Sequence, residues 1–168
     1  MINMGCQHLK EEKPVENIIG EYLVDNKLTI ATAESCTGGL LAGRLINYPG
    51  ISAAFMEGVV TYSNDAKCRR LGVKRETLEQ YGAVSGETAI EMARGVSEAA
   101  GVDIGISTTG IAGPGGGTAQ KPVGLVYVGI CIKNKTSCIE LRLAGDRQQV
   151  REATVDKALE YLRSQLIG

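Results

Sequence analysis

The sequence predicts a single α/β domain, built as a three-layer α/β/α sandwich around a mixed sheet of about five strands. Three observations point to this class. Segments with helical and strand-like apolar periodicity alternate along the chain. The strands predicted over 123–143 are joined by a short turn and must therefore run antiparallel. A chain of 168 residues is long enough for one hydrophobic core and contains no linker that would divide it.

The first half of the chain alternates helix and strand signals. Pro14 suits the start of a helix, because its missing N–H costs nothing there. Apolar residues follow at helical spacing up to Leu23. The expected elements are a helix over 14–23, a strand over 29–33, a helix after Gly38-Gly39 with Leu40, Leu41, Leu45 and Ile46 facing inward, a strand over 53–62, and short helices over 65–71 and 74–81.

The second half contains the longest elements. Ser85 suits the N-cap of a helix that Gly101 ends, and a strand follows over 102–109. The near-continuous apolar run over 123–132 indicates a central strand. Alternating residues over 138–143 indicate a strand that is wet on one face, and Asp146 suits the N-cap of the last helix.

Composition excludes several classes of protein. The charges nearly balance, with 18 basic and 19 acidic residues, so we expect no nucleic-acid or anionic-membrane partner. The longest apolar run, 125–132, is far shorter than the roughly 20 residues of a membrane helix. Residues 1–13 are polar, contain no signal-peptide core, and are expected to form a disordered leader before a domain over 14–168.

Cysteine and histidine usage argues against a metal centre. The five cysteines are odd in number, no pair has C-x-x-C spacing, and there is one histidine. This pattern favours free cysteines in a reducing cytoplasm and predicts no metal site. Glycine, in contrast, is abundant, with 22 residues, so parts of the chain need bare backbone.

The segment 33–39, Ala-Glu-Ser-Cys-Thr-Gly-Gly, lies between a predicted strand end and a helix start. A helix N-terminus offers unpaired N–H groups and a positive dipole end, and glycines let a ligand approach the backbone closely. A serine at such a turn is presented outward, as nucleophiles at strand–turn–helix sites are. Ser35 is therefore a candidate nucleophile, although Ser35 and Thr37 can equally serve only to cap the helix.

Two further loops are candidates for ligand binding. Residues 108–118 follow a strand end and are rich in glycine, yet match neither a Walker A motif nor a dinucleotide fingerprint, so a tight loop or flap is the alternative. Arg147 begins the last helix and suits either a phosphate or a surface salt bridge.

Residues 62–67 form either a plain polar turn or the segment from which Tyr62 or Lys67 reaches Ser35. Because the only histidine, His8, lies in the predicted leader, Lys67 is the candidate base, provided that its pKa is lowered.

Six motifs, taken in order, resemble the CinA C-terminal domain family from about residue 14 to residue 165: AESCTGG (33–39), VVTYSNDAK (59–67), YGAVSGET (81–88), TTGIAGPGGGT (108–118), KPVGLVYV (121–128) and GDR (145–147). The characterised members are nicotinamide-nucleotide amidohydrolases of the PncC type. The resemblance implies hydrolysis of the carboxamide of nicotinamide mononucleotide to nicotinate mononucleotide and ammonia, in pyridine nucleotide salvage. It also implies a cytoplasmic homodimer that uses neither metal nor cofactor.

The resemblance assigns roles to individual residues. Ser35 would be the nucleophile and Lys67 the base, while Tyr62 and Thr109 would line the reacting centre. Cys36 is the competing nucleophile. The residues expected to bind substrate are Thr37, Gly38, Gly39, Gly110, Gly113, Gly116, Gly117 and Arg147, the last of them through the substrate phosphate.

A different class of function stays open. The chain can instead be a non-catalytic module that binds a nucleotide and supports a competence or damage response through a protein partner. Many relatives carry an additional N-terminal domain that is linked to ADP-ribose pyrophosphatase activity. Only about 13 residues precede the match here, so we expect a stand-alone deamidase without that activity.

Overall fold

The computed structural model describes residues 13–168, and within them five strands form one mixed sheet. In chain order the strands are β1 (Ile30–Glu34), β2 (Phe55–Val60), β3 (Ile104–Gly110), β4 (Leu125–Ile132) and β5 (Lys135–Arg142). Their order in space is β2-β1-β3-β4-β5. β1 runs parallel to β2 and β3, whereas the β3–β4 and β4–β5 pairs are antiparallel. The predicted mixed sheet is therefore confirmed.

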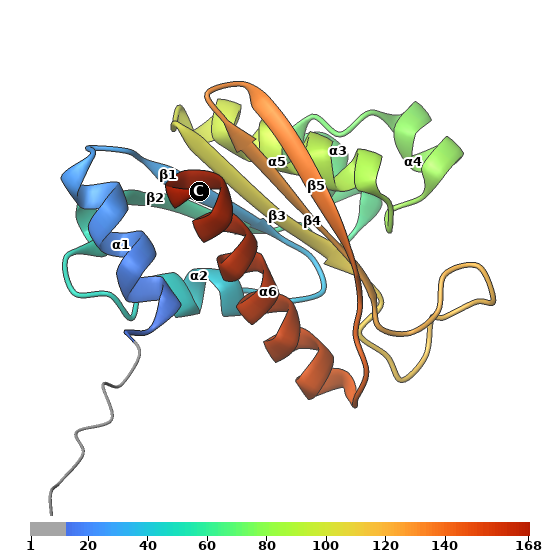
Figure 1. Cartoon of the computed structure of the whole chain (residues 1–168). Helices are drawn as coiled ribbons and strands as arrows, with labels where there is room; N and C mark the ends of the chain where they lie inside the picture. Colours follow the sequence, from blue (N-terminus) through green and yellow to red (C-terminus); the bar gives the residue numbers. More distant parts are fainter. Residues whose placement is uncertain (1–12) are drawn as a thin grey trace, which may run out of the picture.

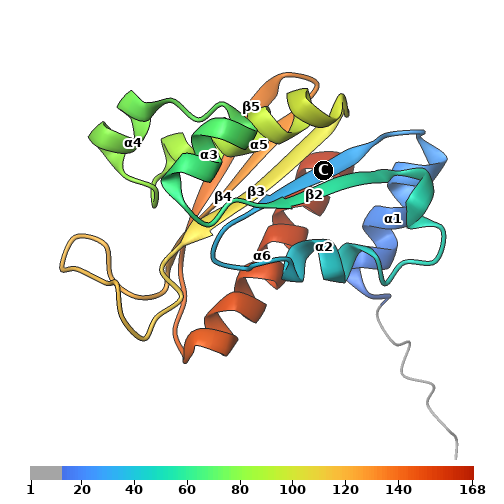
Figure 2. The same cartoon turned by 180° about the vertical axis from the view of Figure 1, so that it is seen from behind.

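Helices cover both faces of this sheet, which confirms the three-layer class. α1 (Val15–Asp25), α2 (Leu40–Leu45) and α6 (Arg147–Ile167) lie on one face (Figure 1), and α3 (Asn64–Leu71), α4 (Arg75–Tyr81) and α5 (Gly86–Ala100) lie on the other (Figure 2). None of the helices described in residues 13–168 combines the length and apolarity that crossing a membrane requires.

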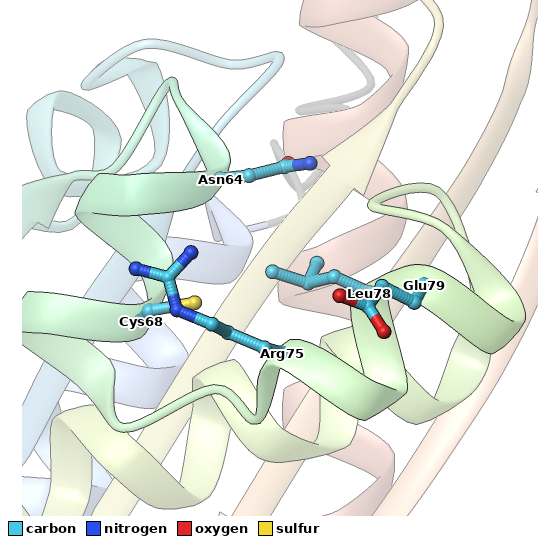
Figure 3. Close-up of a pocket in the computed structure, with 5 residues that line it drawn as sticks. All are labelled: Asn64, Cys68, Arg75, Leu78 and Glu79. Atoms are coloured by element: carbon cyan, nitrogen blue, oxygen red, sulfur yellow. The ribbon is translucent and has the colours of Figure 1, made fainter.

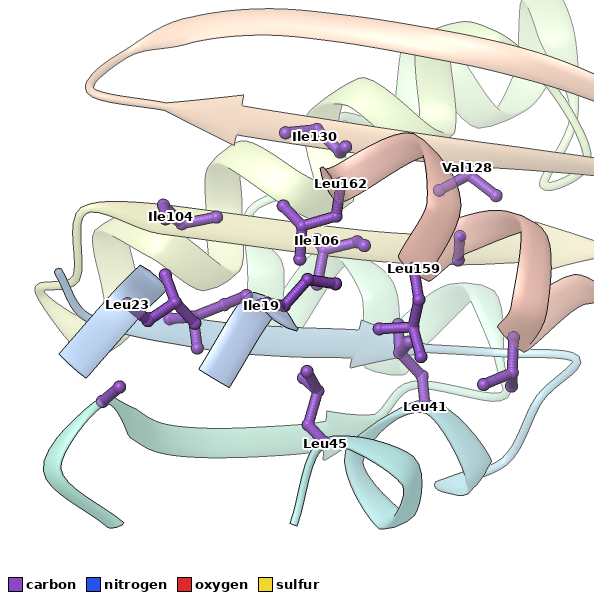
Figure 4. Close-up of a cluster of buried hydrophobic side chains, with 14 of the residues drawn as sticks. Ile19, Leu23, Leu41, Leu45, Ile104, Ile106, Val128, Ile130, Leu159 and Leu162 are labelled. Atoms are coloured by element: carbon purple, nitrogen blue, oxygen red, sulfur yellow. The ribbon is translucent and has the colours of Figure 1, made fainter. Parts of the chain in front are cut away.

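Each face of the sheet has its own apolar core. Ile19, Leu159 and Leu162 of α1 and α6 pack against the strand residues Ile106 and Ile130, as Figure 4 shows. A smaller cluster on the opposite face joins alanines of β1 to Met92 and Val96 of α5. Both clusters are buried, and burial of each large apolar side chain contributes about 1.5–3 kcal/mol to folding.

Glycines let α5 lie unusually close to its neighbours. A Cβ added to Gly95 of α5 would lie 1.8 Å from the carbonyl oxygen of Leu71, and one added to Gly105 of β3 would lie 1.9 Å from that of Ala93. Part of the high glycine content therefore serves the packing of α5 rather than ligand binding.

Three expectations need correction. Residues 51–53 form a 3-10 helix, so β2 begins at Phe55 rather than at residue 53. Leu40 and Ile46 are 38% and 58% exposed, because α2 is only six residues long and turns only Leu41 and Leu45 into the core. Lys133 and Asn134 adopt positive φ angles in a tight hairpin turn, so β5 starts at Lys135.

The predicted leader over residues 1–13 lies outside the described residues, apart from Lys13. The ammonium of Lys13 pairs with the carboxylate of Glu21 on α1.

Candidate active site

The three candidate loops meet at one edge of the sheet. β2, β1 and β3 are parallel, so their carboxyl ends lie side by side. The N–H of Ser35, just after β1, donates to the carbonyl of Thr108 at 3.0 Å, and the N–H of Thr61, just after β2, donates to the carbonyl of Glu34 at 2.9 Å. The strand pairing thus brings residues 33–39, 61–67 and 108–118 together.

Lys67 lies against Ser35. Its side chain is 1% exposed, and its Nζ lies 3.2 Å from Ser35 Oγ and 2.8 Å from the carbonyl oxygen of Thr61. Ser63 caps α3 by accepting a hydrogen bond from the N–H of Ala66, which sets the direction of the helix that carries Lys67. Within residues 13–168 Lys67 forms no salt bridge. Burial disfavours its charged form and lowers its pKa from the ordinary value of 10.5.

Cys36, the competing nucleophile, is poorly suited to that role. Its side chain is 5% exposed, and burial raises the pKa of its thiol to about 11. The thiolate is the reactive form of cysteine, so Cys36 is almost entirely unreactive thiol near neutral pH.

The side chain of Glu34 binds backbone amides at the start of α2. Its carboxylate is 1% exposed and accepts hydrogen bonds from the N–H groups of Gly39, Leu41 and Ala42 at 2.9, 3.0 and 2.9 Å. The expectation that the first amides of α2 are open to a ligand is therefore wrong for these three groups. A charged residue at the end of an otherwise buried strand, a few residues before a helix, was the signal for this internal cap.

Thr37 belongs to the same internal network. Its buried hydroxyl donates to Glu34 Oε2 at 2.6 Å and lies 2.6 Å from the hydroxyl of Thr108. Its side chain therefore fastens the turn and is not exposed to a ligand. Gly38 and Gly39 adopt φ angles of 61° and 103°, so the turn itself requires glycine.

Two amides of the Ser35 turn stay unpartnered. Among the hydrogen bonds of the described chain, the N–H of Gly38 donates to Ser35, that of Gly39 to Glu34, and those of Cys36 and Thr37 to no group. These two adjacent N–H groups are the donors of the turn that have no acceptor within the described chain.

Arg147 joins two of the predicted loops. Asp146 caps α6 in a capping box with Gln149, which confirms the predicted cap and fixes Arg147 in the first turn. The guanidinium donates to the carbonyl of Gly113 at 2.8 Å and to the hydroxyl of Tyr62 at 2.9 Å. Tyr62 therefore contacts Arg147, and no hydrogen bond of the described residues joins it to Ser35 or Lys67.

Arg151 is a site residue that sequence reasoning missed. It lies one helical turn beyond Arg147, and it donates to the carbonyls of Cys36 at 3.1 Å and Thr37 at 2.9 Å. The spacing of four residues on a predicted helix was the available signal. Neither arginine forms a salt bridge within residues 13–168, so neither guanidinium is paired with a carboxylate there.

Thr109 points toward the helix α5 side of the sheet. Its hydroxyl donates to the carbonyl of Ala83 at 2.7 Å, and it makes no hydrogen bond to Ser35 or Lys67 in the described chain. Gly110 is required by packing, because an added Cβ would lie 2.8 Å from the Cα of Val126. At Gly117 the same atom would lie 2.8 Å from the backbone nitrogen of Val123.

The rest of the glycine-rich loop extends from the body of the molecule (Figure 1). Gly113 and Gly116 adopt φ angles of 86° and 85°. Arg147 holds the start of the loop through Gly113, and Lys121 holds its end by donating to the carbonyls of Tyr81 and Val84. The loop is thus tied at both ends while residues 114–120 stay exposed.

The family model of the CinA C-terminal domain matches residues 12–166. The chain belongs to this family. A relative from Clostridium novyi, named as a competence-damage inducible protein, is 65% identical over 156 residues, and one of the same name from Clostridium acetobutylicum is 63% identical over 154 residues. These matches cover 93% and 92% of this chain but 38% of each relative, so the chain spans well under half of their length.

Solved structures of CinA-family proteins share the fold. The competence/damage inducible protein CihA from Agrobacterium tumefaciens superposes with a TM-score of 0.87 at 45% identity, covering 89% of this chain and 92% of that one. A CinA superfamily protein from Klebsiella pneumoniae superposes with a TM-score of 0.88 at 35% identity, covering 91% and 96%.

This CinA domain also has a cavity beside α3, the helix that carries Lys67. It measures about 170 Å³ and lies between α3 and α4, lined by Asn64, Cys68, Arg75, Leu78 and Glu79 (Figure 3). Asn64 and Cys68 are the neighbours of Lys67 on α3, although no predicted site residue lines the cavity. In residues 13–168 no three His, Cys, Asp or Glu side chains gather as metal ligands would.

Proposed function

We propose that the chain hydrolyses the carboxamide of nicotinamide mononucleotide, releasing nicotinate mononucleotide and ammonia. The single observation that carries this proposal is the 3.2 Å contact between Ser35 and the buried Lys67. A lysine of lowered pKa beside a serine is a known way to activate a hydroxyl without histidine. The family to which the chain belongs supports the substrate.

The proposed reaction has two halves. Neutral Lys67 takes the proton of Ser35 as Oγ attacks the carboxamide carbon, and the N–H groups of Cys36 and Thr37 stabilise the oxyanion. The C–N bond then breaks and Lys67 returns the proton to the leaving ammonia. Lys67 then takes a proton from water as the water oxygen attacks the acyl carbon, the bond from that carbon to Ser35 Oγ breaks, and Lys67 returns the proton to Oγ. The acid product loses its own proton to solvent and leaves as the carboxylate. No step in this sequence needs a cofactor.

The phosphate of the substrate is proposed to bind at Arg147 and the neighbouring glycine-rich loop. The guanidinium now contacts a carbonyl and the hydroxyl of Tyr62, both neutral groups, and a phosphate is a stronger partner.

The deciding experiment measures ammonia release from nicotinamide mononucleotide, with nicotinamide riboside run alongside. Ser35→Ala is expected to lower kcat by at least about 10³-fold, because the covalent route is lost. Ser164→Ala, a serine of α6 outside the site, is the matched control and keeps its rate. Full activity in a folded Ser35→Ala protein would contradict the proposed nucleophile.

A second candidate is suggested by the names of the relatives, which refer to competence and damage. In that case the chain binds a nucleotide without turnover and acts through a protein partner. Calorimetric binding of the mononucleotide with no ammonia released over a long incubation would favour this function.

The assembly and location are also proposals. Four exposed apolar side chains belong to α2, its C-cap and β2: Leu40, Ile46, Met56 and Val60. Their exposure supports a homodimer. Light scattering is expected to give twice the mass of one chain.

The four described cysteines are free, which supports the reducing cytoplasm as the location.

A further inference from the structure

The turn that carries Ser35 is held from both sides by charged residues that do not touch the reacting groups. Glu34 precedes Ser35 and fixes the start of α2, while Arg151 reaches from α6 to the carbonyls of the two residues that follow Ser35. Neither charged group is hydrogen-bonded to Ser35 Oγ or Lys67 Nζ in the described chain. The two residues therefore act on the backbone of the turn.

Burial of the Glu34 side chain destabilises the fold unless hydrogen bonds replace the lost water. A carboxyl group that is 1% exposed loses its hydration, and no cation of residues 13–168 pairs with it. Four accepted hydrogen bonds compensate: two come from amides of α2, one from the amide of its N-cap and one from the hydroxyl of Thr37. α2 has no side-chain cap of its own, since its N-cap is Gly39, so Glu34 supplies the cap from the end of β1.

Most hydrogen-bonding groups of the turn therefore have partners. The carboxylate of Glu34 accepts from the amides of Gly39, Leu41 and Ala42. The guanidinium of Arg151 donates to the carbonyls of Cys36 and Thr37. What stays open is the pair of amides directly after Ser35. The carboxylate thus keeps an anion off the helix start and leaves only the two donors that adjoin the nucleophile.

We propose that Glu34, together with Arg151, is a positioning residue that holds the Ser35 turn rigid against β1, α2 and α6. It thereby sets Ser35 Oγ at its distance from Lys67 and fixes the direction of the N–H groups of Cys36 and Thr37. The role of the turn as a nucleophile site rests on the proposed function. The positioning role makes its own prediction about Ser35 reactivity, which needs no nucleotide.

The first test is Glu34→Gln, which keeps the size of the side chain. The glutamine amide accepts at one oxygen only, so its NH₂ group faces an amide N–H of α2 and the turn loosens. We expect kcat for ammonia release to fall about 10- to 100-fold, since a displacement near 1 Å costs about that much. KM is expected to stay within about threefold, because the phosphate binds at Arg147. Glu16→Gln, another buried glutamate but on α1, is the matched control.

The second test measures the reactivity of Ser35 with an alkyl fluorophosphonate, followed by intact mass. Ser35 Oγ forms a bond to phosphorus, fluoride leaves, and Lys67 takes the hydroxyl proton. Labelling of Glu34→Gln is expected to be at least 10-fold slower than that of the unaltered chain, at an unchanged pH midpoint, because the burial of Lys67 is preserved. A merely structural loss would instead lower the melting temperature and leave the rate of the folded fraction unchanged.

The outcomes separate this proposal from the proposed function. Equal labelling rates, or an unchanged kcat, in Glu34→Gln would overturn the positioning role while leaving the nucleophile in place. Labelling without any ammonia release would overturn the substrate alone. If the unaltered chain neither labels nor releases ammonia, the nucleophile is wrong and the positioning role falls with it.

Arg151→Met keeps the test decisive if Glu34→Gln does not fold. The substitution retains an apolar stem and removes both hydrogen bonds to the turn. The same pattern is expected, a slower kcat and slower labelling with KM nearly unchanged. Wild-type values for both quantities in a folded Arg151→Met protein would contradict the proposal.

Discussion

At the scale of single residues, burial decides which groups near the turn are reactive. Burial lowers the pKa of the Lys67 ammonium and raises that of the Cys36 thiol to about 11, because desolvation always disfavours the charged form. In the proposed mechanism the lysine is the base, whereas the thiol stays protonated near neutral pH. Ser35, which is half-buried, is the proposed nucleophile, and its Oγ lies 3.2 Å from Lys67 Nζ.

The pH dependence follows from Lys67. Only its neutral form accepts a proton, so kcat/KM should rise with pH through the lowered pKa and level off above it, with a midpoint below 10.5. Lys67→Arg is expected to lose at least about 10³-fold, because arginine does not deprotonate usefully. Lys157→Arg, an exposed lysine on α6, is the control. Initial rates across the pH range measure both effects, and a normal rate in Lys67→Arg would remove lysine from the base role.

At the scale of elements, the first two turns of α6 connect the loops of the site. Arg147 contacts Tyr62 after β2 and Gly113 after β3, and Arg151 contacts the turn after β1. One helix start therefore reaches the ends of all three parallel strands. The capping box of Asp146 fixes the position at which this helix begins.

Arg147→Met tests the contribution of this helix to substrate binding. Loss of a charge-assisted contact of about 1.5–3 kcal/mol should raise KM for the mononucleotide roughly 10- to 100-fold. Any turnover of the riboside, which carries no phosphate, should change little. Arg163→Met, near the other end of α6, controls for the loss of a positive charge. Steady-state kinetics on both substrates make the comparison, and equal effects on the two would contradict a phosphate contact.

At the scale of the whole molecule, the site joins parts that are far apart in the chain. Residues from β1, α3 and α6 meet only in the folded state, so a ligand that bridges them must stabilise the fold. The apolar cores on the two faces of the sheet contain none of Ser35, Lys67 and Arg147. A gain in stability on adding ligand therefore measures binding at the site and not a change in core packing.

Binding can thus be measured without turnover. In Ser35→Ala protein, nicotinamide mononucleotide at 100 times its Kd should add about 2.7 kcal/mol to the free energy of unfolding. That corresponds to a rise in Tm of about 5–10 °C for a chain of this size. Nicotinamide riboside should give a smaller shift. A scan in which neither ligand moves Tm would argue against binding at this site.

Local patterns in the sequence determined the elements, the class of fold and the candidate turn. Apolar periodicity, the caps at Ser85 and Asp146 and the short hairpin turn act over neighbouring residues, so they are readable before folding. The motif around Ser35 and the candidate base Lys67 were also identifiable, and the structure places them in contact.

Only the tertiary structure decided which groups share the site and which are already occupied. The strand order places β1 between β2 and β3, and this order depends on pairings across long stretches of chain. The internal cap by Glu34, the reach of Arg151 and the contact of Tyr62 with Arg147 depend on it in turn. Hydrogen bonds and burial are properties of side chains meeting in space, and for this reason spacing along the sequence could not assign them.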